Sequence, residues 1–390
     1  MNPSASGWLN KLLTLLPQSA YVGQEDVLFY KYIKQTGFIY GSNVSLLPKE
    51  IKQEDFNEEE LCKVNLISAF YYIYKTQNSS EDFTTSIVEF YKSIEEHKRS
   101  FLSDLFGEPS SDKLVERIIQ KRIHIDDNIL TKNFNYFLIN VFLFVDVLGY
   151  RHFLKNESQT KAYINNLESA IESIVFDVLD SKSNKTEYDQ NIIKLFESSI
   201  RQKTQQSFND SDLKHIVTQP LEKQYIIDIV CMACWSDVYI DKNELEFLID
   251  LKTKLEISNL QLLDSIDDIN NFYSIHKDHI AFLKSKNLAK SFYENSSNIV
   301  KRLIKRNSKR LIKELSQSKE AIELLAKSTH SDLTDEEQKK IQNQLLDIFK
   351  SIPSLAIFIL PGGMILLPLF IKFIPKLLPS AFDENRIENE

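Results

Sequence analysis

Apolar residues recur every three or four positions along most of this chain, which is the period of an α-helix. Residues 56–76 carry Leu61, Val64, Ile67 and Phe70 at this spacing, and they are expected to form a helix with one buried face. The pattern predicts an all-α protein: a multi-helix cytosolic region followed by one proline-kinked hydrophobic helix at the C-terminal end.

Two further runs are too apolar for a surface helix. Residues 136–150 are interrupted only by Asn140 and Asp146, and they are too short and too polar to span a bilayer, so a buried core helix is expected. Residues 221–235 follow Pro220 and are apolar nearly all round, which places that helix in the centre of a helical region.

After this central helix, the next one is expected to begin with a capping box. Asp241 and Glu244 have the required spacing, in which each side chain accepts a backbone N–H of the first turn. The four residues expected to form the buried face of this helix are Leu245, Leu248, Ile249 and Leu255.

Composition supports a folded helical chain. Of 390 residues, 43% are hydrophobic and 26% charged, and there are only 8 Gly and 10 Pro. The net charge of -8 excludes a uniformly basic nucleic-acid binder. Three cysteines do not provide a disulfide framework, and the first residues do not resemble a secretory signal. We therefore expect the bulk of the chain on the cytoplasmic side.

The predicted organisation has five parts. They are an N-terminal helical region (1–210), a compact helical module (211–290), basic and amphipathic helices (291–350), a hydrophobic segment (351–382) and a polar tail (383–390).

A basic amphipathic helix is predicted over residues 301–313. Its apolar stripe consists of Val300, Ile304, Leu311 and Leu315, and the opposite half of the helix is basic. Such a face binds anions, either lipid headgroups or RNA phosphate, or is simply solvated. The basic residues are Lys301, Arg302, Lys305, Arg306, Lys309, Arg310 and Lys313.

The hydrophobic segment begins at Ser351 and continues to Ile371 without a charged residue. As one helix it would extend about 31 Å, close to the thickness of a bilayer core. A membrane-spanning helix is therefore predicted. Two alternatives are a re-entrant hairpin that turns at Gly362-Gly363 and a buried helix with kinks.

Prolines are concentrated in this segment. Pro361, Pro368 and Pro375 are spaced by seven residues and would share one face of a helix, on which Lys372 would also lie and reach the interface. The residues predicted to define the membrane segment are Pro353, Pro361, Gly362, Gly363, Met364, Pro368, Lys372, Pro375 and Pro379.

Residues 231–258 resemble the tellurite-resistance B-like helical module, in which an acidic turn joins two helices. Asp237, Ile240, Asp241 and Glu244 match its pattern, while Val238 occupies the position of the family glycine. The resemblance implies a weak divalent-metal site at Asp237, Asp241 and Glu244. The alternative is that these residues cap and solvate the turn.

Residues 310–382 resemble the Letm family of leucine-zipper, EF-hand, transmembrane proteins. The matching stretches are Leu333-Thr334 with Glu337, LDIFKSIP at 346–353, and LLPLFIKFIPKLLPSAF at 366–382. Together with residues 231–258, the arrangement resembles the Letm-related biofilm-associated proteins of bacteria.

The Letm resemblance implies a protein of the bacterial inner membrane that takes part in cation/proton exchange or associates with ribosomes. The family carries a carboxylate between its central prolines where this chain has Met364, and no acid lies between Asp347 and Asp383. The family's ribosome-binding domain follows its membrane helix, whereas the candidate ribosome-binding surface here is residues 301–313.

The remaining motifs do not indicate catalysis. Cys231 and Cys234 lie on an apolar helix without a second pair, so they are expected in the core, and His276 and His279 are expected at the surface. We expect no enzyme activity, no cofactor and no DNA partner. The predicted function is a membrane-anchored interaction protein that binds ribosome or anionic lipid, and the alternative is a subunit of a K⁺ or Ca²⁺/proton exchange system formed as a homo-oligomer.

Overall fold

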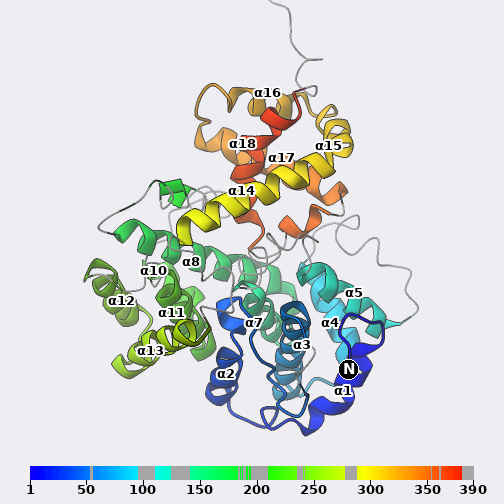
Figure 1. The fold of residues 1–390 in the computed structure, drawn as a ribbon, viewed down its shortest axis with the longest axis vertical. Helices are drawn as coiled ribbons and strands as arrows, with labels where there is room; N and C mark the ends of the chain where they lie inside the picture. Colours follow the sequence, from blue (N-terminus) through cyan, green and yellow to red (C-terminus); the bar gives the residue numbers. More distant parts are fainter. Residues whose placement is uncertain are drawn as a thin grey trace, which may run out of the picture.

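The computed structural model describes residues 1–52, 56–94, 110–123, 141–182, 185, 187, 190–191, 193–194, 210–234, 240, 242–276, 288–352, 354–359 and 362–379. These residues form helices and turns with no strand among them, which confirms the all-α prediction (Figure 1). The helices of the first half are α1 (Trp8–Leu15), α2 (Asp26–Gln35), α3 (Glu58–Thr76), α4 (Phe83–Ile94), α5 (Ser111–Ile123), α7 (Leu143–Phe153) and α8 (Thr160–Ser181).

The second half continues with α10 (Asp210–Ile216), α11 (Pro220–Cys234), α12 (Lys242–Lys254) and α13 (Asn259–His276). The last group is α14 (Leu288–Arg306), α15 (Ser308–Leu315), α16 (Lys319–Lys327), α17 (Asp335–Ser351) and α18 (Leu367–Leu377). Figure 1 shows this last group gathered at the top of the molecule, whereas α12 and α13 lie at the lower left. Short 3₁₀ turns are η1 (Leu16–Gln18), η2 (Phe38–Tyr40), η4 (Glu157–Gln159), η6 (Ala356–Ile359) and η7 (Met364–Leu366).

The two helices predicted from apolar runs are indeed the centre of the fold. The helix α7 packs against α3 and α8, and α11 packs against α8 and α13. Cys231 and Cys234 of α11 are completely buried, as expected. The helix α3 begins with a capping box at Asn57 and Glu60, which satisfies backbone N–H groups of its first turn. One hydrophobic cluster connects these helices with α14, α17 and α18.

A buried ion pair joins three helices of the first half. Arg122 of α5 donates from Nε and Nη2 to the carboxylate of Asp146 of α7, at 2.8 and 3.2 Å. The hydroxyl of Tyr91 on α4 donates to the same carboxylate at 2.9 Å. Because Arg122 and Asp146 are both fully buried, this polar group fixes how α4, α5 and α7 meet.

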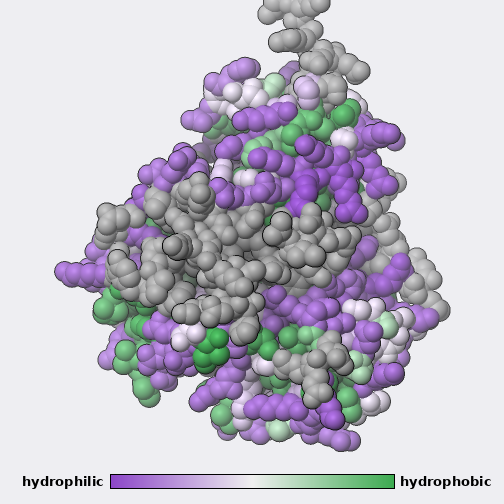
Figure 2. Space-filling model, in the orientation of Figure 1, coloured by the Kyte–Doolittle hydropathy of each residue, from purple (hydrophilic) through white to green (hydrophobic). Residues whose placement is uncertain are grey.

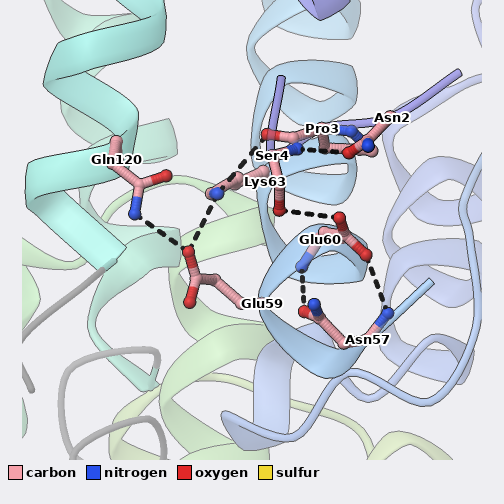
Figure 3. A network of polar contacts seen from close by, with 8 residues as sticks. All are labelled: Asn2, Pro3, Ser4, Asn57, Glu59, Glu60, Lys63 and Gln120. Carbon is pink, nitrogen blue, oxygen red and sulfur yellow. Dashed lines mark hydrogen bonds and ion pairs between the residues drawn. The ribbon is translucent and has the colours of Figure 1, made fainter. Parts of the chain in front are cut away.

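The N-terminal residues are attached to α3, and Gln120 of α5 bonds to the same polar network through Glu59 (Figure 3). The Ser4 hydroxyl donates to Glu60 at 2.7 Å, and the buried Lys63 ammonium lies 2.9 Å from Glu59 and 3.4 Å from the carbonyl of Pro3. These contacts hold the start of the chain against the helical core.

The predicted buried face of α12 is only half correct. Leu248 and Leu255 are buried against the rest of the module, but Leu245 and Ile249 are largely exposed. The helix α12 contacts α8, α10, α11 and α13, and these neighbours leave Leu245 and Ile249 uncovered.

Candidate anion-binding surface on the C-terminal helices

The basic stretch 301–313 is divided between two helices and does not form the single helix that the sequence predicts. The helix α14 ends at Arg306 and α15 begins at Ser308, with Asn307 between them in a non-helical conformation. The Asn307 side chain donates to the carbonyl of Leu303 at 2.8 Å and accepts from the Ser354 hydroxyl at 2.8 Å. The bend is therefore tied to the loop that follows α17.

The apolar stripe predicted for this stretch is confirmed, since all four of its residues are buried. They are Val300, Ile304, Leu311 and Leu315. The opposite side consists of cationic side chains. Five of them are exposed and two are half-buried: Lys305, Arg306, Lys309, Arg310 and Lys313 in the first group, Lys301 and Arg302 in the second.

None of the five exposed cations forms an ion pair with another residue that the structure describes. Lys305 and Arg306 occupy the last turn of α14, where the helix dipole favours positive charge. Lys313 likewise occupies the last turn of α15. The dipole accounts for these three cations but not for Lys309 and Arg310, which lie in the first turn of α15. Their charge is left for solvent or for an anionic partner, and Figure 2 shows hydrophilic side chains over this part of the molecule.

The underside of α14 is covered by α18, and cations mark the edges of this contact. Phe373 of α18 is buried, and the ammonium groups of Lys301 and Lys372 lie 4.7 and 5.8 Å from its ring centroid. The Lys372 ammonium also donates to the Tyr293 hydroxyl at 2.6 Å. Lys372, which the sequence assigns to a membrane interface, thus extends the basic surface of α14 onto α18.

Residues 351–371 do not form the continuous helix that the sequence predicts. The helix α17 ends at Ser351, and Ile352 is extended, as expected for a residue that precedes a proline. Two 3₁₀ turns follow before α18 begins at Leu367. The prolines therefore do not share one helix: Pro368 is the second residue of α18, Pro375 lies inside it and Pro379 follows it, while Pro353 and Pro361 lie outside the described residues.

Gly362 and Gly363 form a turn, and this turn packs against a residue of the first half of the chain. Gly362 has φ 81°, and a Cβ atom there would lie 2.8 Å from the ring of Phe142, so only glycine fits. Its N–H donates to the buried carboxylate of Glu168 on α8. Glu168 has no signal in the sequence, because no local pattern indicates a contact across 194 residues. Gly363 is buried and Met364 half-buried.

Membrane and metal predictions are not supported by the described residues. Among them, no helix combines the length and the apolar character needed to cross a bilayer. In the same residues no group of three or more metal-ligating side chains is found. Glu244 is buried, whereas Asp237 and Asp241 lie outside the described residues, so the metal site stays a prediction.

We compared the sequence with known protein families and proteins, and the matches fall on the C-terminal helices. Residues 333–390 match the family model described as "LETM1-like, RBD". The "Mitochondrial proton/calcium exchanger protein" of Drosophila melanogaster is 43% identical over 58 residues, which are 15% of this chain and 6% of that protein. No solved structure matches. The family match does not reach residues 231–258, whose tellurite-resistance B-like assignment stays a prediction.

Proposed function

We propose that this protein is a Letm-related interaction protein whose basic surface binds ribosomal RNA, because residues 333–390 match the family model described as "LETM1-like, RBD". We define the basic surface as Lys301, Arg302, Lys305, Arg306, Lys309, Arg310, Lys313 and Lys372. The observation that carries the proposal is the packing of α14, the helix that begins this surface, onto α18 of the matched segment.

The contacts support treating the basic surface and the matched segment as one unit. Lys301 lies over Phe373, Lys372 bonds to Tyr293, and Asn307 bonds to Ser354. Each contact joins α14 or the residue that follows it to residues 352–379. The surface thus belongs with the segment that resembles a Letm RBD, although it precedes that segment in the chain.

Phosphate binding follows from the charge arrangement. Five exposed cations without an ion-pair partner among the described residues would each release a counterion on meeting a phosphate. For RNA the logarithm of the affinity is expected to fall with the logarithm of salt concentration, with a slope of roughly -0.7 to -0.9 per contact. Binding should therefore weaken steeply with salt.

A charge-reversal experiment tests the proposal on the full chain. The variant Lys305→Glu/Arg306→Glu/Lys309→Glu should bind purified ribosomes at least about tenfold more weakly at physiological salt, with a salt slope smaller by roughly 2 to 3. The matched control changes three exposed lysines elsewhere by the same charge: Lys52→Glu/Lys155→Glu/Lys214→Glu.

Equal weakening in both triple variants would mean that net charge alone controls binding, and the proposed surface would be wrong. Binding to vesicles that contain anionic lipid, together with no binding to ribosomes or ribosomal RNA, would replace the RNA partner with a lipid headgroup.

Attachment to the inner membrane through residues 351–382 is a further part of the proposal, and it is supported only by the Letm resemblance. The buried residues of α18 would have to leave α14 to enter lipid. Truncation before Ser351 would remove part of the core, so carbonate extraction of the full chain is the better test. Recovery of the chain in the carbonate-soluble fraction would exclude stable insertion.

Cation/proton exchange is the second candidate, because the similar Drosophila protein is an exchanger by its description. The segment from 348 to 382 contains no acid, and this function would need several copies to enclose a path. Ion flux in proteoliposomes that disappears in Lys372→Ala would support it, and absence of flux would exclude it.

A further inference from the structure

Four large apolar side chains stand exposed together on α12 and α13. Leu245 and Ile249 on α12 are 42% and 49% exposed, and Leu260 and Leu263 on α13 are 68% and 58% exposed. We call these four residues the apolar strip. Figure 2 shows hydrophobic residues gathered at the side of the molecule where Figure 1 places these helices. Folded proteins rarely leave such a contiguous patch without a partner.

The strip has two halves on neighbouring helices. The helices α12 and α13 contact each other and are joined by residues 255–258. Leu245 and Ile249 are four residues apart and Leu260 and Leu263 three apart, so each pair shares one face of its own helix. At about 1.5 Å per residue, Ile249 and Leu263 both lie within two turns of the connection.

The strip is a second apolar face, in addition to the one that holds these helices in the fold. Leu248, Leu251 and Leu262 are almost completely buried, and both helices pack on α11. Because both helices already have a buried apolar face, the exposed leucines and isoleucine are additional to the core.

Negative charge borders the strip on α13. Asp264 and Asp267 follow Leu260 and Leu263 by four residues and lie on the same helix face. Neither forms an ion pair with any other described residue. The acids on α12 are already compensated, since Glu246 and Asp250 pair with Lys242 and Lys254. The uncompensated acids favour a cationic partner and disfavour both RNA and an anionic lipid surface.

We propose that the apolar strip with Asp264 and Asp267 is a docking surface for a partner protein that presents an amphipathic helix, with an apolar stripe flanked by Lys or Arg. Helices of this kind bind apolar surfaces through residues spaced three and four apart. A second copy of this chain is a poor occupant, because the apolar stripe beneath its own basic surface is buried. The proposal is independent of the proposed ribosome binding.

The test uses the full chain and a labelled synthetic peptide of about 18 residues, helical, with a leucine stripe flanked by lysines. Fluorescence anisotropy should show micromolar binding. Leu260→Ser/Leu263→Ser should weaken binding at least about tenfold, and Asp264→Asn/Asp267→Asn should weaken it several-fold and reduce its salt dependence.

The matched control is Val27→Ser/Leu28→Ser on α2, where two apolar side chains are 71% and 42% exposed away from the strip. This control should leave peptide binding unchanged, and all three variants should bind ribosomes like the unmodified chain. Ribosome binding thereby separates failure of this proposal from failure of the proposed function.

Three results would overturn the docking surface as described: no binding at about 100 μM peptide, equal binding of a peptide with glutamates in place of the lysines, or equal loss in the α2 control. Self-association that Leu260→Ser/Leu263→Ser abolishes would assign the strip to a second copy of the chain and would overturn the proposed partner.

Discussion

Removal of Arg122 is expected to destabilise the first half of the chain strongly. In Arg122→Met, the carboxylate of Asp146 stays buried and keeps only the Tyr91 hydroxyl among the donors described for it above. Burial opposes the charge of Arg122, but Asp146, Tyr91 and Glu168 together outweigh this effect and raise the pKa of the guanidinium, so the arginine stays cationic.

The magnitude follows from the geometry. Removing one partner of a fully buried pair costs about 3–5 kcal/mol, because the remaining charge has lost its compensation. Replacing the whole group with apolar residues of similar size is often neutral. The variant Tyr91→Phe/Arg122→Met/Asp146→Leu should therefore be more stable than Arg122→Met alone, even though it contains more substitutions.

Urea unfolding followed by circular dichroism at 222 nm measures both free energies of unfolding. Tyr91→Phe alone is the matched control, and it should cost only about 1 kcal/mol because one hydrogen bond is lost. A loss below about 1 kcal/mol for Arg122→Met would show that water reaches Asp146. A triple variant less stable than the single one would refute the reasoning about uncompensated charge.

Three further changes test other parts of the fold. Asp82→Ala removes the side chain that accepts from the first turn of α4; it should cost about 1 kcal/mol at pH 7, measured by urea unfolding. The Thr84 hydroxyl, more than any other group, lowers the pKa of Asp82, so this difference should persist above the usual carboxylate pKa and vanish as pH falls through the depressed one. Gly37→Ala should cost more than about 2 kcal/mol, because φ is 81° and the new Cβ would meet the Phe272 ring at 2.8 Å; the melting temperature reports it. Asn307→Ala should lower both the melting temperature and ribosome affinity, since the bend between α14 and α15 loses its bonds; an unchanged affinity would show that the bend does not position the basic surface.

Helices and their ends were predictable where the signal is local. Thr334 and Glu337 have the spacing of a capping box and form one, and Ile341, Leu345 and Ile348 follow at helical spacing and are buried. Both features depend on residues within one or two helical turns, which the sequence pattern contains directly. The resemblance of the C-terminal segment to the Letm family was likewise readable, because its prolines and apolar residues agree in register.

Other features depend on contacts that no local pattern contains. Residues 351–371 have the length of a membrane helix, but the turn at Gly362 and the start of α18 at Leu367 divide them. Hydrophobicity alone does not distinguish burial in lipid from burial under α14. The bend at Asn307 was missed for the same reason, since its side chain bonds to Ser354 across 47 residues.

The two faces of α14 have a mechanical consequence. Separating α18 from α14 would uncover the ring of Phe373 and would break the contacts that Lys301 and Lys372 make across the two helices. Exposing one large aromatic side chain costs roughly 1.5–3 kcal/mol, a sizeable part of the stability of a typical domain. The two helices are thus expected to move together, so that a displacement of the cations on α14 would be accompanied by a displacement of α18.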